Sequence, residues 1–336
     1  MKKISIVIPT YNEEENVAEI CSAVKNIMET KLQKYNYEIL FIDNDSKDKT
    51  RLLISGLCAE NKKVKAIFNA KNFGPNRSPY HGLISSTGDC AILLVADFQE
   101  PPEKIVDFVR EWEKGAKIVC GIKNKSRTNP IIHGLRTLYY KMINSMSDVE
   151  QIEHFNCFGL YDRGFLDVLA SVDDPQPYLR GLVSELGFRR SEVRYTQEKR
   201  RAGKSSFSFM KYYDFAMLGF TSYTKAGLRI ALFFGVIISF IGILIAICYL
   251  ILKLTHWDSY PGGTAPTLIG VFLFGGIQLF FIGLLGEYVL SINSKIVKRP
   301  LVIEEKRINF ENSRGLLGSS GGRKSKRIIK KRSEPK

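Results

Sequence analysis

The sequence lacks the features that mark several common classes of protein. Its six cysteines are scattered without a C-x-x-C pair, and its four histidines have no metal-ligand spacing. These absences exclude a disulfide framework and a zinc site, and they fit a reducing cytosol. The pattern G-x-G-x-x-G is also absent, which argues against a dinucleotide-dependent dehydrogenase. Any metal that the protein uses is therefore expected to have oxygen ligands.

The amino terminus lacks a signal peptide. Met1-Lys2-Lys3 is followed by one short apolar run, residues 4–8, which Pro9 ends and acidic residues follow. We therefore expect the globular part to stay in the compartment in which it is made. With 336 residues, of which 45% are hydrophobic, the chain can form one domain with a sizeable core and a further module.

Two long stretches near the carboxyl end carry no charge. They cover residues 230–252 and 266–286, and each exceeds the ~20 residues that a helix needs to cross ~30 Å of hydrocarbon. Buried helices of a soluble domain are the alternative, but such helices seldom run so long without a charge. We therefore predict a two-helix transmembrane domain within residues 230–290. Residues 206–229 fit either an amphipathic helix on the membrane surface or an ordinary packed helix.

The charges predict which side of the membrane each part occupies. Basic residues flank the two spans at Lys225, Arg229, Lys295, Lys298 and Arg299. The positive-inside rule then places both termini and the amino-terminal domain in the cytoplasm, with only the loop around Trp257 outside. The net charge of +15 suits nucleic acid, an anionic membrane or a phosphorylated substrate. We predict that the basic tail 311–336 is disordered. Because it follows a membrane span, anionic lipid headgroups are a simpler partner for it than nucleic acid.

Residues 1–122 alternate short apolar runs with helical patterns. The runs predict strands at residues 4–8, 37–42, 64–68, 90–96 and 117–120. A helix is predicted to begin at Glu13, capped by Asn12, with Glu15 completing a capping box, and another covers residues 49–60. Strands alternating with helices predict an α/β fold with a mainly parallel sheet covered on both faces.

Polar residues gather where these strands end. Tyr11 and Glu13 follow the first strand, Asp43 ends the second, and Asp97 and Gln99 follow the fourth. In such sheets ligands bind beyond the carboxyl ends of the strands. Carboxylates that meet at this edge are typical of a site for a metal, a sugar or a nucleobase.

Six motifs give this pattern a family resemblance. They are IPTYNEEEN (8–16), IDNDSKDKT (42–50), NFG (72–74), ADFQEPPE (96–103), GFRRSEVRYTQEKRRAGKS (187–205) and GEYV…KRP (286–300). In this order, ahead of two spans, they resemble the family 2 glycosyltransferases of the GT-A fold, and among them the polyprenyl-phosphate sugar transferases. The resemblance implies inverting transfer of a sugar from a nucleotide-diphosphate sugar, with a UDP-hexose favoured, to polyprenyl (undecaprenyl) phosphate. It also implies a bacterial inner (plasma) membrane location and a homo-oligomer such as a tetramer.

The resemblance also assigns roles to residues at the strand ends. Asp97 and Gln99 correspond to the pair that holds Mg²⁺ or Mn²⁺ against the donor diphosphate. The nucleoside pocket corresponds to Pro9, Tyr11, Glu13 and Asp43.

Basic residues further along the chain correspond to phosphate-binding positions. Arg201 matches the arginine that binds the diphosphate from a mobile loop, which makes it a catalytic candidate beside Asp97, and Lys204 assists it. Lys123 and Arg136 face the diphosphate or the lipid phosphate in the family. Surface salt bridges are an equal alternative for these last two.

The sequence departs from the family pattern at three positions. Val95 and Asn44 stand where aspartates are common, and Cys157 stands where many relatives have an aspartate proposed as a base. An acceptor phosphate monoester has a second pKa of ~6 and arrives largely as a competent nucleophile, so positioning and charge stabilisation can suffice. We therefore assign no base.

Two rival functions remain open. The run Gln197-Glu198-Lys199-Arg200 is similar to the Q-x-x-R-W signature of processive polysaccharide synthases, but Arg201 replaces the tryptophan. A catalytically impaired scaffold of a glycan-assembly complex would explain Val95 and Cys157.

The predicted organisation of the chain has five parts. They are a catalytic domain (1–205), juxtamembrane helices (206–229), transmembrane helices (230–290), a cytoplasmic segment (291–310) and a disordered tail (311–336).

Overall fold

The computed structural model describes residues 1–124, 152–172, 174–198, 264–297 and 299–310, with scattered residues between 217 and 255. The amino-terminal part of the chain and a strand near the carboxyl end form one eight-stranded sheet in the order β7-β5-β6-β4-β1-β2-β3-β8. The strands are β1 (Lys3–Thr10), β2 (Asn36–Asp43), β3 (Val64–Asn69), β4 (Cys90–Leu93), β5 (Ile118–Asn124), β6 (Phe155–Asp162), β7 (Arg190–Thr196) and β8 (Glu304–Ile308). The helices packed on the sheet are α1 (Val17–Thr30), α2 (Thr50–Glu60), α3 (Gly74–Ser85), α4 (Lys104–Glu113), α6 (Arg163–Ser171) and α7 (Leu179–Glu185).

The centre of the sheet is parallel. β1 pairs in parallel with both β2 and β4, and β2 pairs in parallel with β3. β6 and β8 join antiparallel to their neighbours. The predicted α/β class with a mainly parallel sheet is confirmed, and all five predicted strands are present. β4 ends at Leu93, earlier than predicted, and β5 continues to Asn124.

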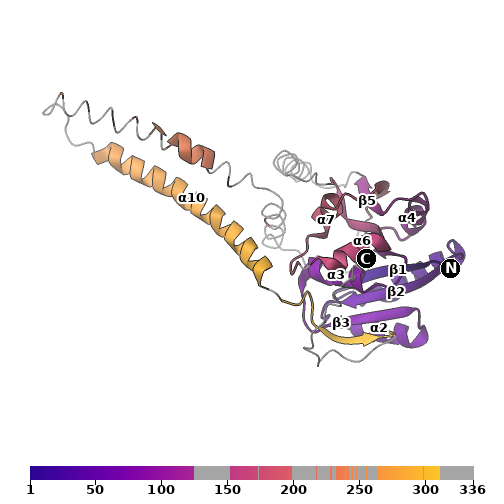
Figure 1. The fold of residues 1–336 in the computed structure, drawn as a ribbon. Coiled ribbons are helices and arrows are strands. Elements are labelled where there is room, and N and C mark those ends of the chain that lie inside the picture. Colours follow the sequence, from indigo (N-terminus) through magenta and orange to yellow (C-terminus); the bar gives the residue numbers. More distant parts are fainter. Residues whose placement is uncertain are drawn as a thin grey trace, which may run out of the picture.

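Helices cover both faces of this sheet (Figure 1). Ile4, Ile6 and Ile8 of β1 pack with α1, α2 and α4 in one buried cluster. Val7 belongs to a second cluster, which includes residues of α3, α6 and α7. Because both faces of the central strands are covered, these strands are continuous apolar runs rather than alternating ones.

The predicted cap of the first helix is wrong. Asn12 has φ 55° and lies in a turn before the helix, and α1 begins only at Val17, after Asn16. The side chain of Asn12 accepts a hydrogen bond from the amide of Lys47, 2.8 Å away. Asn12 therefore joins two loops, a long-range role that a local capping pattern does not reveal.

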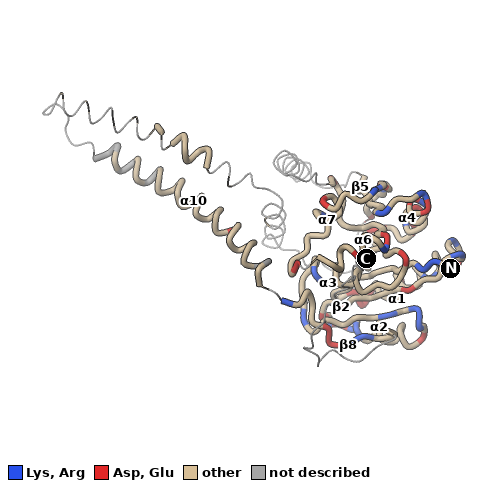
Figure 2. Tube along the Cα trace, in the orientation of Figure 1, with Lys and Arg blue, Asp and Glu red and all other residues tan. Residues whose placement is uncertain are grey.

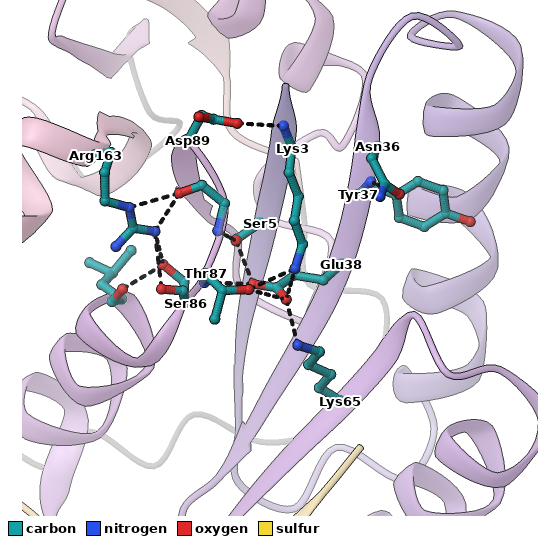
Figure 3. Close-up of polar contacts among 12 residues, drawn as sticks. Lys3, Ser5, Asn36, Tyr37, Glu38, Lys65, Ser86, Thr87, Asp89 and Arg163 are labelled. Atoms are coloured by element: carbon teal, nitrogen blue, oxygen red, sulfur yellow. Dashed lines mark hydrogen bonds and ion pairs between the residues drawn. The ribbon is translucent and has the colours of Figure 1, made fainter. Parts of the chain in front are cut away.

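A buried polar cluster lies at the amino-terminal end of the sheet (Figure 3). Its centre is Glu38, which is 1% exposed. The carboxylate accepts hydrogen bonds from Lys3 Nζ and Ser5 Oγ, both at 2.6 Å, and from the Thr87 amide at 2.8 Å. Lys65 Nζ lies 2.9 Å away. Burial alone would raise the pKa of Glu38, but these partners outweigh it and lower the pKa to about 2.

One long helix extends away from the sheet. α10 (Thr264–Ile296) has 33 residues, about 50 Å at 1.5 Å per residue. Among the described residues, it alone contains a stretch long and apolar enough to cross a membrane, Phe274–Asn293, and only 6% of that stretch is buried. Figure 2 shows α10 mostly in tan, with the charged residues concentrated on the domain. An apolar helix with its side chains exposed suits lipid rather than a protein core.

The predicted first span lies mostly outside the described residues. Residues 232–238 are helical, and Leu232 and Phe233 are exposed. The two-span arrangement therefore stays a prediction. The tail 311–336 also lies outside the described residues.

The chain returns to the sheet after α10. Residues 304–308, which the sequence indicated only as part of a cytoplasmic segment, form β8 on the outer edge of β3. The register pairs Ala66 with Ile308 and Phe68 with Lys306. The segment that leaves the membrane-length helix is therefore part of the domain.

Candidate active site

The predicted site residues at the strand ends lie at one edge of the sheet. Thr10 and Asp43 are register partners on β1 and β2, and β4 lies on the other side of β1. Pro9 is in β1, and Tyr11 is 37% exposed just beyond the end of this strand. The structure therefore brings Tyr11 and Glu13 beside the loop that follows Asp43.

Asp43 connects the loops that follow β1 and β2 through buried hydrogen bonds. It is 0% exposed, and it accepts hydrogen bonds from the Ser46 hydroxyl and from the Ser46 amide, the latter at 3.1 Å. Ser46 Oγ in turn accepts a hydrogen bond of 2.9 Å from the Asn12 amide. The carboxylate thus shapes the surface of the site through Ser46.

The charge on Asp43 is only partly compensated. Burial raises the pKa of Asp43, while the hydrogen bonds from Ser46 and the charge of Arg51 oppose the rise. Arg51 Nε lies 3.4 Å from Asp43 Oδ1. Arg51 was not among the predicted site residues, because it follows the family motif and the sequence gives no sign of its partner.

Asn44 organises the loop that contains the NFG motif. Its Oδ1 accepts hydrogen bonds from Asn69 Nδ2 at 3.2 Å and the Phe73 amide at 2.9 Å. Its Nδ2 donates to Asn72 Oδ1 at 2.9 Å and to the Gly74 carbonyl at 3.2 Å. An aspartate could not donate these last two bonds. The departure from the family pattern at Asn44 therefore has a structural reason.

Asp97 and Gln99 occupy a tight turn after β4. Asp97 is 7% exposed, and its Oδ1 accepts a hydrogen bond of 3.1 Å from the Gln99 amide. Phe98 between them has φ 58°. The turn holds a carboxylate and an amide side chain at the same sheet edge as Tyr11 and Asp43.

Gln197 connects this turn to Lys123. Gln197 Nε2 donates to Gln99 Oε1 at 2.7 Å, and Lys123 Nζ donates to Gln197 Oε1 at 3.0 Å. The Glu198 amide also donates to the Gln99 carbonyl at 3.2 Å. Lys123 is thereby near the predicted metal side of the site. The sequence singled out Gln197 only as part of a synthase-like signature, and its contact with Gln99 depends on the pairing of β5 with β7.

A further buried carboxylate of the site, Glu100, was not predicted from the sequence. Glu100 is 2% exposed, and it accepts hydrogen bonds from the Val95 amide at 3.3 Å and from Asn156 Nδ2 at 3.1 Å. Burial raises the pKa of Glu100 to about 8, against the opposing effects of the Val95 amide and the charge of Lys123. Its position before Pro-Pro, directly after a buried strand and its turn, was the available signal.

Cys157, which is part of β6, lies close to Glu100. It has φ 69°, and burial raises the pKa of its thiol to about 12. The thiol is therefore neutral near pH 7 and does not replace the anionic aspartate of the family pattern. The remaining predicted residues, Arg136, Arg201 and Lys204, lie outside the described residues.

The donor atoms of the Asp97 turn fit a divalent cation. Asp97 and Gln99 offer oxygen atoms, which Mg²⁺ and Mn²⁺ prefer. Within the described parts of the chain, no three His, Cys, Asp or Glu side chains gather into a metal-binding group. Mg²⁺ commonly takes one or two protein carboxylates and completes its shell with water and substrate phosphates. The turn suits that kind of partial site.

Known proteins with similar sequences identify the family. Residues 5–170 match the model of glycosyl transferase family 2. The uncharacterized glycosyltransferase YkcC of Bacillus subtilis is 30% identical over 92% of this chain and 95% of its own. The putative glycosyltransferase CsbB of the same organism is 32% identical, with 88% and 89% covered. A prophage bactoprenol glucosyl transferase homolog of Escherichia coli is 29% identical, with 90% and 98% covered. This chain belongs to glycosyl transferase family 2.

Proposed function

We propose that the protein transfers a hexose from a nucleoside diphosphate, UDP in the favoured case, to polyprenyl phosphate, with inversion at the anomeric carbon. The family membership supports sugar transfer, and the bactoprenol glucosyl transferase name of a relative supports the lipid acceptor. A bacterial inner membrane location with a cytoplasmic active site goes with this acceptor.

One observation carries the proposal: the membrane-length helix and the sheet are structurally continuous. α10 ends at Ile296, and β8 of the same sheet begins at Glu304. If the apolar, exposed helix lies in a bilayer, this short connection keeps the domain close to the bilayer surface. An acceptor whose phosphate lies at that surface can then reach the sheet edge, whereas a soluble acceptor would need no such anchor.

The chain's own residues would divide the work as follows. Tyr11 and Glu13 contact the nucleoside from the loop that Asp43 holds. Asp97 and Gln99 would hold a divalent ion, which would supply positive charge to the diphosphate leaving group. Lys123, Arg136, Arg201 and Lys204 contribute positive charge toward the phosphates.

No side chain is required to create the nucleophile in this proposal. The acceptor phosphate is largely a dianion near neutral pH, so its oxygen attacks the anomeric carbon as the bond to the diphosphate breaks. This reasoning agrees with the neutral thiol of Cys157. Orientation of the two substrates then supplies much of the rate.

The direct test uses purified full-length protein and polyprenyl phosphate. A panel of radiolabelled UDP-hexoses, UDP-N-acetylhexosamines and GDP-mannose is added in turn with Mg²⁺ or Mn²⁺, and label is counted in the organic phase. One donor should label the lipid, and Asp97→Ala should remove the signal. A parent protein that transfers nothing from any donor would favour the scaffold function, and label in a long polymer would favour a processive synthase.

A further inference from the structure

The segment that follows α10 is bound to the domain by many specific contacts. We refer to residues 299–310 as the post-helix segment. The Ala70 amide donates to the Ile303 carbonyl at 2.9 Å, which extends the pairing of β3 with β8. Arg77 of α3 donates to the carbonyls of Leu301 and Pro300, both at 2.7 Å. At the far end, Asn309 Nδ2 donates to the carbonyls of Cys58 and Val64, at 2.6 and 2.7 Å.

One of these contacts leads directly to the proposed donor site. Glu305 of β8 forms an ion pair with Arg51 in the first turn of α2, with Oε2 2.6 Å from Nη2. The same guanidinium approaches Asp43 Oδ1 through Nε, at 3.4 Å. It also lies over the ring of Phe68, 5.0 Å from the ring centre. Arg51 is therefore oriented by three neighbours and bridges two carboxylates.

The contacts continue from Asp43 to the surface of the site. Asp43 accepts hydrogen bonds from Ser46, Ser46 Oγ accepts one from the Asn12 amide, and Asn12 Oδ1 accepts one from the Lys47 amide. The loops at both strand ends thus depend on the Asp43 carboxylate. These loops include Tyr11 and Glu13, the residues proposed to contact the nucleoside.

We propose that the post-helix segment positions the donor site: Glu305 orients Arg51, and Arg51 holds Asp43 and the two loops above it. Arg51 and Glu305 are positioning residues in this scheme and do not touch the substrate. An arginine suits the role because its planar fork can contact two carboxylates at once, which a lysine cannot match. The part of the inference that concerns the donor rests on the proposed function, whereas the chain of contacts does not.

The first experiment measures amide hydrogen exchange in the full-length protein in lipid nanodiscs. The amides of Asn12, Ser46 and Lys47 should exchange about two- to fivefold faster in Glu305→Gln. This factor corresponds to the free energy that a partly exposed ion pair typically contributes. Arg51→Ala should give about tenfold, because Asp43 then loses a charged partner. Lys306→Gln is the matched control, since Lys306 is the exposed neighbour on the same strand, and it should change nothing.

The second experiment measures transfer kinetics with the donor found in the panel assay. Each variant should raise the KM for the nucleotide sugar by a factor similar to its effect on exchange, while kcat changes by less than about twofold, since the lost contact orders the free site. The double variant Arg51→Ala/Glu305→Gln should behave like Arg51→Ala alone, because the two residues act in series.

The outcomes separate this inference from the proposed function. Unchanged exchange at Asn12 and Ser46 in Arg51→Ala would overturn the inference, as would equal acceleration in Lys306→Gln or in the amides of β6. An active parent whose KM is the same in all variants would refute the link to the donor. A parent that transfers no sugar would refute the proposed function, while the exchange experiment would still decide whether the contacts hold the loops.

Discussion

Strand β2 has a buried carboxylate at each end, and the two have opposite electrostatic surroundings. Glu38 at the start meets two lysines, a serine and a backbone amide (Figure 3), and its pKa is lowered to about 2. Asp43 at the end has Ser46 close by and Arg51 at 3.4 Å, and burial raises its pKa. The same strand therefore stabilises one carboxylate fully and leaves the other incompletely compensated.

The contrast extends to the rest of the sheet. Glu100, at the same edge as Asp43, also has a raised pKa, about 8. Buried charge without full compensation costs stability, and it gathers where a site must bind charged ligands. The amino-terminal end of the sheet thus contributes stability, and the carboxyl-terminal end retains polar groups that stability alone does not require.

The largest expected effect is at the carboxyl-terminal end. Asp97→Ala should lower the transfer rate by about 10³-fold, because the charge on the leaving diphosphate loses its stabilising partner. Its unfolding temperature should stay close to that of the parent. Label transferred to lipid and thermal unfolding would be measured on the same preparations, and EDTA should reproduce the loss reversibly. Full activity of Asp97→Ala in EDTA would contradict the assignment.

At the amino-terminal end of the sheet, Glu38→Gln should have the opposite effect: it should lower the stability of the protein and leave its activity almost unchanged. The substitution leaves Lys3 and Lys65 without their carboxylate, so the free energy of unfolding should fall by about 3 kcal/mol at pH 7. The KM and kcat of transfer should change little in protein that remains folded. Glu60→Gln, an exposed glutamate at the end of α2, is the matched control. A loss as small as that of the control would show that the cluster contributes no stability.

The pH dependence of stability should follow the direction of the Glu38 shift. Because its folded pKa of about 2 lies below the ordinary value of 4.5, its contribution is complete above pH 4.5 and is lost as the pH falls toward 2. The parent should therefore lose about 3 kcal/mol more than Glu38→Gln over this window. Denaturant unfolding at several pH values would measure the difference.

A smaller effect is expected from Asn44→Asp. The aspartate cannot donate to Asn72 and Gly74, and its charge would face their oxygen atoms. We expect about 2 kcal/mol of destabilisation, with faster amide exchange at Phe73. The control is Asn36→Asp, because Asn36 uses its side-chain oxygen to accept from the Tyr37 amide, and an aspartate retains that bond. Equal effects at the two positions would contradict the role of the Asn44 amide.

The smallest effect, and one of opposite sign, is expected from Glu100→Gln. The folded pKa of about 8 lies above 4.5, so the parent's stability should decline as the pH rises from 4.5 through 8. Glutamine removes this dependence, but both carboxylate oxygens accept hydrogen bonds, so its NH₂ group faces a donor and we expect a net gain of only about 1 kcal/mol near pH 8. Unfolding by urea at pH 5 and pH 8 would measure it. A loss at pH 8 would mean that the ionised carboxylate is well compensated.

The sequence predicted most of the central sheet and the sheet edge at which the candidate residues gather, because both depend on local patterns. Buried parallel strands are apolar runs, and polar residues at their ends meet at one edge. The contacts that it could not predict join distant parts of the chain. Arg51 and Glu305 are separated by 254 positions, and Gln99 and Gln197 by 98. Asn12 fitted a cap by its spacing, but a partner on another loop determined its conformation.

The attachment of β8 to β3 also restricts how the chain can cross a bilayer. All eight strands belong to one sheet, so if α10 crosses a bilayer, its carboxyl end lies on the same side as the domain. A helix that crosses once must then begin on the opposite side. In such an arrangement the chain between β7 and α10 would have to cross an odd number of times, and we propose that residues 230–252 supply the crossing. A cysteine introduced at Ser259 should therefore react with an impermeant thiol reagent in intact cells.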